Sequence, residues 1–266
     1  MTARLGERCP IDPRRWLLYV CGGANEEPVL LLDTFTAPRR ALGQVGAGVS
    51  VMPALVAATL AALVHAAVLV PRLDVEAVVE QRHSMSAQEG KEAPAAMTPH
   101  EREEAVVSQR KLTAAGVYAW GLLGSTLQAF GVALALWLAF KVAGVGPAFR
   151  STFAVASYGL LPLGLAKLLS LPALLGRGTI APTALAQLLP SHLGVLLPPG
   201  SSGPLAGLLG SINLFSLWSL VLVIMGMAAA ARTSTWRASV VTVVMWLSYV
   251  AVFGVALAAV AARAQS

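Results

Sequence analysis

Long apolar stretches separated by polar segments dominate the chain, and their lengths predict membrane-spanning helices. A helix needs about 20 apolar residues to cross a hydrocarbon core of roughly 30 Å. Five stretches reach this length, at 48–70, 112–142, 152–175, 211–231 and 238–262. The sequence therefore predicts an all-α, polytopic integral membrane protein with five transmembrane helices, which form one domain over 48–262 behind an N-terminal segment over 1–47.

The pattern inside these spans predicts their shape. The stretch 112–142 is longer than a span requires, so its helix must tilt or project into solvent. The stretch 152–175 contains Pro162 and Pro172, and each proline removes a backbone donor, so this helix should be bent or broken. Only the turn Thr233–Trp236 separates the last two spans, which predicts a helical hairpin.

The polar loop over 71–111 ends in a pattern typical of a helix start. Thr98 and Glu101 form a T-x-x-E capping box, and Pro99 occupies the first helical position. We therefore expect a helix that begins here, stands clear of the bilayer and continues directly into the second span.

Two other segments each allow two interpretations. Residues 181–210 are apolar but interrupted by proline and glycine, which favours an interfacial or re-entrant loop and leaves a sixth short span as the alternative. Near the N-terminus, Pro38 is followed by Arg39 and Arg40. With Thr36 as N-cap, this pattern predicts a short helix at the cytoplasmic surface, and a plain juxtamembrane linker is the alternative.

Composition excludes a soluble domain. Apolar residues make up 56% of the chain and charged residues 12%, against roughly 25% charged residues in an ordinary soluble domain. All thirteen acidic residues lie between Glu7 and Glu104, so residues 105–266 offer no carboxylate for proton relay or acid–base catalysis. The chain is therefore predicted not to be an enzyme.

Basic residues near the span ends predict the orientation. Cytoplasmic loops of membrane proteins carry an excess of Lys and Arg. In the shorter loops, the pairs Lys141/Arg150 and Arg232/Arg237 fall on one side of the membrane, whereas the short segments of the other side carry single bases. With five spans, this bias places the N-terminus in the cytoplasm and the C-terminus outside.

Few residues offer the chemistry of a site. Cys9 and Cys21 supply only two of the four ligands that a structural zinc needs, so no metal and no cofactor are predicted. His65 lies near the end of the first span, where it is either a residue at the membrane interface or a functional residue. Lys167 lies inside the third span, where it either snorkels to a lipid phosphate or faces a polar pocket in the bundle. No motif indicates a nucleic-acid partner.

The fourth span has two distinguishable sides. At about 100° per residue, Asn213 and Ser216 share one stripe, while Phe215 and Trp218 lie on roughly the opposite side. Because the amide of Asn213 must satisfy its donors and acceptor, we expect the side with Asn213 and Ser216 to face the bundle, near Lys167 or the backbone freed by Pro162. Gly226, with a small residue one turn later, should allow the last two helices to approach closely.

Several short motifs resemble those of the YIP domain family, named in eukaryotes for interaction with Ypt/Rab GTPases. The family's pattern of an acid, Phe, Trp and Gly in the fourth span maps onto Asn213, Phe215, Trp218 and Gly226, with Asn213 in place of the acid. The resemblance covers about residues 30–262. Its other matches are Pro38 before the first span, Tyr158 and Pro162 in the third, and the closing hairpin from Arg232.

The resemblance implies five transmembrane helices, a cytosolic N-terminus and no enzymatic activity. Eukaryotic relatives act in vesicle trafficking and membrane shaping, but the Ala- and Leu-rich composition is typical of a bacterial chain, which has no Rab partner. We therefore expect a multi-pass inner-membrane protein that works as a scaffold or interaction protein. Its partners would be the lipid bilayer and another membrane protein or a second copy. The alternative is a small transporter or channel subunit with a path near Lys167.

Overall fold

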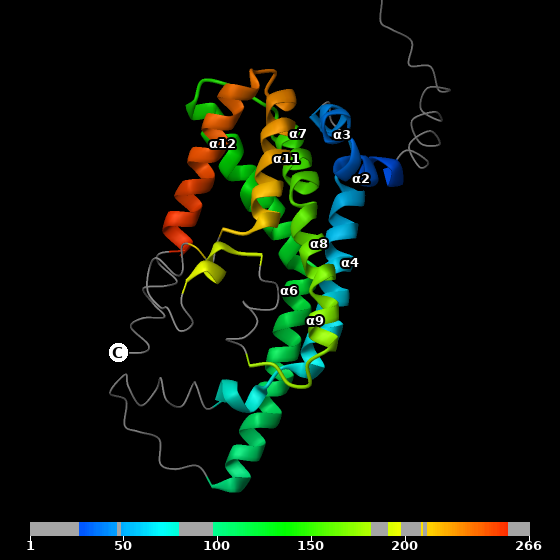
Figure 1. Ribbon diagram of the computed structural model, residues 1–266, viewed down its shortest axis with the longest axis vertical. Helices are drawn as coiled ribbons and strands as arrows, with labels where there is room; N and C mark the ends of the chain where they lie inside the picture. The colour runs from blue at the N-terminus through cyan, green and yellow to red at the C-terminus, as the bar shows by residue number, and fades with distance from the viewer. Residues whose placement is uncertain are drawn as a thin grey trace, which may run out of the picture.

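A computed structural model describes residues 27–46, 49–79, 98–181, 191–197, 209 and 212–254. These residues fold into a helical bundle in which the only β-type pairings are isolated bridges (Figure 1). The helices are α2 (Glu27–Thr36), α3 (Pro38–Gly46), α4 (Met52–Leu69), α6 (Pro99–Val142), α7 (Phe149–Gly159), α8 (Leu161–Leu169), α9 (Leu171–Leu175), α11 (Leu214–Ala230) and α12 (Thr235–Tyr249). Short 3₁₀ turns follow α4 (Val70–Arg72) and precede α11 (Leu193–Leu196), and a π-helical turn (Val250–Gly254) extends α12.

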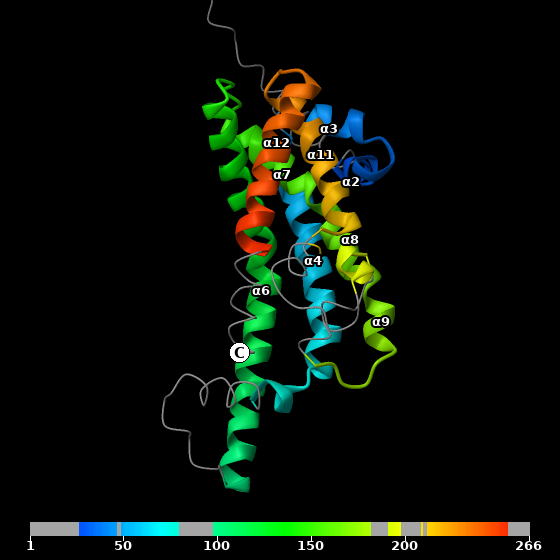
Figure 2. The ribbon, with the colours of Figure 1, turned by 60° about the vertical axis from the view of Figure 1, so that its left-hand side comes forward.

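The helices run alternately up and down the bundle. One end of the bundle is the end where α3 packs (Figure 1, Figure 2). It holds the starts of α4, α7 and α12 and the ends of α6 and α11. We call this the loop end, because the connections at 143–148 and 231–234 are both there. The opposite end carries the N-terminal turns of α6, which extend beyond the other helices (Figure 1).

Four helical segments of the described chain are long and apolar enough to cross a membrane. They are Met52–Arg72, His100–Val142, Phe149–Leu175 and Thr235–Val252. The fourth predicted span corresponds to α11, which is apolar but has 17 residues. At 1.5 Å per residue it rises about 26 Å, less than a hydrocarbon core of roughly 30 Å. The count of five spans and the orientation therefore stay predictions.

The third predicted span is broken where the sequence indicates. Pro162 and Pro172 occupy the first turns of α8 and α9, and α7, α8 and α9 are joined at Leu160 and Ser170. Because a proline has no backbone N–H, the carbonyl one turn earlier loses its helical partner. The predicted bent or broken helix is thus confirmed.

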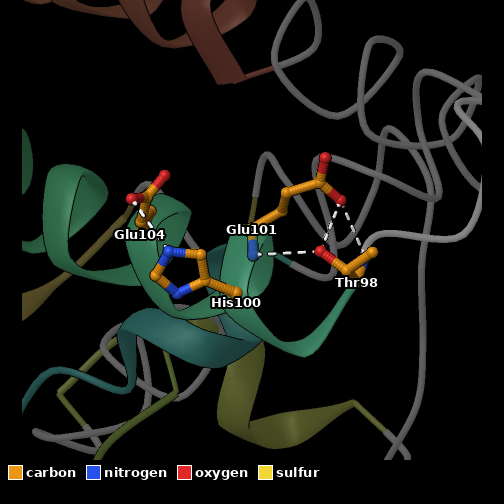
Figure 3. A network of polar contacts seen from close by, with 4 residues as sticks. All are labelled: Thr98, His100, Glu101 and Glu104. Carbon is orange, nitrogen blue, oxygen red and sulfur yellow. Dashed lines mark hydrogen bonds and ion pairs between the residues drawn. The ribbon is translucent and has the colours of Figure 1, made fainter.

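The predicted capping box opens α6, a single helix of 44 residues (Figure 3). Thr98 Oγ1 accepts a hydrogen bond from Glu101 N at 3.3 Å. Glu101 Oε2 accepts two in return at 2.8 Å, from the backbone N and the hydroxyl of Thr98. In the same part of the helix, His100 Nε2 lies 3.5 Å from Oε1 of Glu104, which follows it by one turn. At 1.5 Å per residue the helix is about 66 Å long, so it must project well beyond a bilayer core.

The N-terminal helices correct one detail of the sequence analysis. α3 begins at Pro38 as predicted, and it buries Ala41, Leu42 and Val45 on one side. Thr36 does not cap it, because this residue ends the preceding helix α2, and its hydroxyl donates to the Leu32 carbonyl at 3.1 Å. The helix α2 itself was not predicted from the sequence.

The remaining boundaries differ modestly from prediction. The final hairpin is present, but its turn is at 231–234, and Ser234 caps α12 by accepting from Arg237 N at 3.3 Å. Residues 255–262 of the fifth predicted span, Cys9 and Cys21, and most of 181–210 lie outside the described residues.

We predict that Thr98→Ala weakens the start of α6. Losing an N-cap costs about 1 kcal/mol, so the amides of the first helical turn should exchange with deuterium about fivefold faster in the purified protein. Ser108→Ala is the matched control, because Ser108 is an exposed hydroxyl further along the same helix. Unchanged exchange in Thr98→Ala would contradict the capping role.

Candidate functional site

Two glycines bring α7 and α11 into close contact. A Cβ atom added to Gly226 would lie 2.6 Å from Val155 Cγ1, and one added to Gly159 would lie 2.6 Å from Val223 Cγ2. Each helix therefore contributes one glycine and one valine to the other, and both valines are buried. Small residues that let backbones approach are the usual means of helix association in membranes. Gly226 thus faces α7, whereas the sequence analysis assigned it to the contact between the last two spans.

Tyr158 and Trp218 join the N-terminal part of the chain to this crossing. Tyr158 is completely buried beside Gly159, and its hydroxyl donates to the Ser50 carbonyl just before α4 at 3.2 Å. The ring of Trp218 on α11 meets Phe35 of α2 edge to face, with 5.4 Å between centroids. The α7–α11 crossing therefore contacts both α2 and the residue that leads into α4.

The predicted orientation of the fourth span is wrong. Asn213 is not on a helical stripe but is the N-cap of α11, where its Oδ1 accepts from Ser216 N at 2.8 Å and Ser216 Oγ accepts from Asn213 N at 3.1 Å. Its side-chain oxygen and backbone N–H are thus satisfied within its own turn, which weakens the reason for it to face the bundle near the third span. Phe215 is the buried residue of this turn, at 8% exposure.

The two motif prolines start helices. Pro38 is the first residue of α3, next to the exposed Arg39 and Arg40. Pro162 is buried in the first turn of α8. Pro38, Tyr158, Trp218 and Gly226 therefore belong to elements at the loop half of the bundle, and Pro162 begins the segment that leads from there to Lys167.

Lys167 lines a small polar cavity between α4, α6, α7 and α8. The cavity measures about 20 Å³, and its polar lining residues are Ser125, Gln128, Ser157 and Lys167. This volume holds about one water molecule. The placement agrees with the polar-pocket interpretation of Lys167, and the size of the cavity leaves no room for a solute.

His65 lies against the break between α8 and α9. Its Nδ1 is 3.2 Å from the Lys167 carbonyl and 3.0 Å from Ser170 Oγ, and this hydroxyl is itself 2.7 Å from the same carbonyl. The hydroxyl donates to the carbonyl, so Nδ1 must carry the hydrogen and donate to both oxygens. His65 and Ser170 therefore satisfy backbone that the broken helix leaves exposed.

Sequence reasoning singled out Lys167 but missed Ser157 and Ser170 as members of its surroundings. A serine in an apolar helix commonly bonds its own backbone, and Ser157 does so by donating to the Phe153 carbonyl at 2.8 Å. The preceding Pro162 and following Pro172 marked the broken region, but no pattern showed which residues of other helices would face it.

Comparison with family models finds one that matches most of the chain. The model described as the Yip1 domain matches residues 32–258. This range contains all described helices except the first residues of α2. Comparisons with curated proteins and with solved structures find no match.

We predict that Gly226→Ala destabilises the bundle. The new methyl group would overlap Val155, and overpacking a tight contact costs about 1–3 kcal/mol, so the melting temperature in detergent should fall. Gly131→Ala in α6 is the matched control, because nothing lies within 4 Å of its added Cβ. This control should be neutral or slightly stabilising, since alanine favours a helix. Equal effects of the two changes would contradict the close crossing.

A second prediction concerns the broken third span. Ser170→Ala should lower the free energy of unfolding by about 0.6 kcal/mol, and at most about 1.7, as for other interhelical hydrogen bonds in membranes. Ser239→Ala should have no measurable effect, because that hydroxyl bonds only its own helix at the Thr235 carbonyl. If thermal unfolding gave the same result for both variants, the role of Ser170 beside His65 would be excluded.

Proposed function

Because the chain belongs to the Yip1 domain family, we propose that it is a five-span membrane protein with a cytoplasmic N-terminus that acts as a non-enzymatic scaffold or interaction protein. The four long apolar helices support the membrane assignment directly. The fifth span would be α11, which runs antiparallel between α7 and α12 in the bundle (Figure 1). Local thinning of the bilayer would accommodate its shorter length.

The observation that carries the scaffold proposal is the close packing around Lys167. A path for a solute needs a continuous polar opening, and the cavity beside this lysine holds about one water. The absence of acidic residues from 105 to 266 also disfavours proton or cation coupling through the bundle. We therefore place the function on the surface of the bundle, toward lipid and toward a membrane-protein partner or a second copy. The bacterial inner membrane is the proposed location.

The second candidate is a small transporter or channel subunit. It is favoured by one observation, which is that Lys167 shares its cavity with the polar residues Ser125, Gln128 and Ser157. A protein that opened at the α8–α9 break could expose this lysine to an anion. The broken helix would supply the discontinuity that transporters use at their binding sites.

The orientation can be tested with two glycines that tolerate a side chain. Gly146 at the loop end and Gly178 near the opposite end are both exposed, and nothing lies within 4 Å of an added Cβ at either. With Cys9 and Cys21 changed to serine, we expect a membrane-impermeant thiol reagent on intact cells to label Gly178→Cys and to spare Gly146→Cys. The reverse pattern would overturn the orientation, and labelling of both or neither would overturn the arrangement of spans.

The function is tested by cross-linked purification of the full chain from native membranes. A scaffold should capture a defined membrane protein or a second copy, and Lys167→Met should not change this capture. A transporter should instead make reconstituted vesicles permeable to small anions, and Lys167→Met should abolish the permeability. Anion permeability that depends on Lys167, without capture of a partner or a second copy, would contradict the scaffold proposal.

A further inference from the structure

Basic side chains gather at the loop end of the bundle. They come from four different parts of the chain: α3, the end of α6 with the start of α7, the end of α11 and the start of α12 (Figure 1, Figure 2). All are exposed. We call this group the basic end, and its members are Arg39, Arg40, Lys141, Arg150, Arg232 and Arg237.

Most of the basic end comes from a stretch of the chain without acidic residues. No acidic residue occurs after Glu104, so the four bases from Lys141 onward have none within their own segments. Among the described residues, no carboxylate forms an ion pair with any member, and the single ion pair there, His100–Glu104, is at the opposite end. In the described part of the chain, these six exposed cations are therefore not paired with a carboxylate.

Three features fix the position of four of these cations. Lys141 Nζ lies 4.1 Å from the centroid of the Trp137 ring, and Arg237 Nη2 donates to the Ala143 carbonyl at 2.5 Å. Arg39 and Arg40 lie on the outer side of α3, whose inner side is completely buried. These four cations are thus carried by packed elements.

The surroundings indicate what kind of anion this surface would bind. Each cation lies near the terminus of an apolar helix or on α3, which in the proposed membrane-spanning arrangement is the level of the lipid headgroups. Trp236, 78% exposed at the start of α12, has the position of an interfacial aromatic residue. Guanidinium groups bind phosphate oxygens through paired hydrogen bonds.

We propose that the basic end binds the phosphate groups of anionic phospholipids in one leaflet. The other end of the bundle does not offer the same surface, because the start of α6 carries the exposed acids Glu101, Glu103 and Glu104 together with the exposed bases Arg102, Arg110 and Lys111. The protein therefore selects anionic lipid at one end only. This inference rests on the proposed membrane-spanning arrangement and adds a lipid class to it.

The test compares two matched triple variants of the full chain in vesicles of phosphatidylcholine mixed with phosphatidylglycerol. The first variant, Arg39→Gln with Arg40→Gln and Arg150→Gln, removes half of the basic end and avoids the two cations that bond the protein itself. The control, Arg102→Gln with Arg110→Gln and Lys111→Gln, removes three exposed bases at the opposite end. Spin-labelled lipids report which headgroup is held next to the protein.

Wild type and control should hold phosphatidylglycerol in preference to phosphatidylcholine, and the first variant should lose at least half of this preference. The preference should also weaken with added salt. No preference in the wild type, or equal losses in the two variants, would overturn the proposal. Specific displacement by inorganic phosphate at matched ionic strength would show a site for the free anion and would overturn the lipid assignment.

The vesicle experiment also separates this inference from the proposed function. Protein that is released from the vesicles by an alkaline wash would contradict the membrane-spanning arrangement itself. Protein that stays inserted but holds both lipids equally would contradict only the lipid preference.

Discussion

The close crossing of α7 and α11 is the contact on which the rest of the bundle depends. Between helices in a lipid environment there is little hydrophobic driving force, so association relies on backbones that approach closely. Here Gly159 and Gly226 each admit a valine of the other helix. The same stretch of α7 holds Tyr158, whose hydrogen bond to the Ser50 carbonyl fixes the entry into α4. The crossing thus sets the position of three segments that are far apart in the sequence.

A second constraint is that broken backbone in an apolar bundle must find partners. The prolines of α8 and α9 remove helical donors, and His65 and Ser170 supply hydrogen bonds at the resulting break. Lys167, on the same broken segment, faces a cavity lined by hydroxyl and amide groups instead of a carboxylate. The small size of this cavity is the basis for proposing a scaffold over a solute path.

Features that depend on neighbouring residues in the sequence could be predicted, and features that depend on tertiary contacts could not. The capping box at Thr98 and the breaks at the prolines each depend on residues within one turn, and both are present. The orientation of α11 was mispredicted because a stripe analysis assumes that Asn213 is inside the helix, whereas it caps it. The contact of Gly226 with Val155 could not be predicted either, because a glycine in a helix does not indicate which neighbouring helix packs against it. Thr36 was assigned to α3 because a threonine shortly before a proline is typical of a helix start, whereas α2 continues through this residue.

The most direct test of this account is a double-mutant cycle on the reciprocal contact, Gly159 with Val223. Gly159→Ala alone should lower the free energy of unfolding, because its methyl group would lie within 2.6 Å of Val223 Cγ2. In a Val223→Ala background the same change should cost less, giving a coupling energy of about 1 kcal/mol or more, as expected for residues in contact. If the two effects added to within roughly 0.3–0.5 kcal/mol, as they do for independent sites, the α7–α11 crossing would not be the contact that organises the bundle.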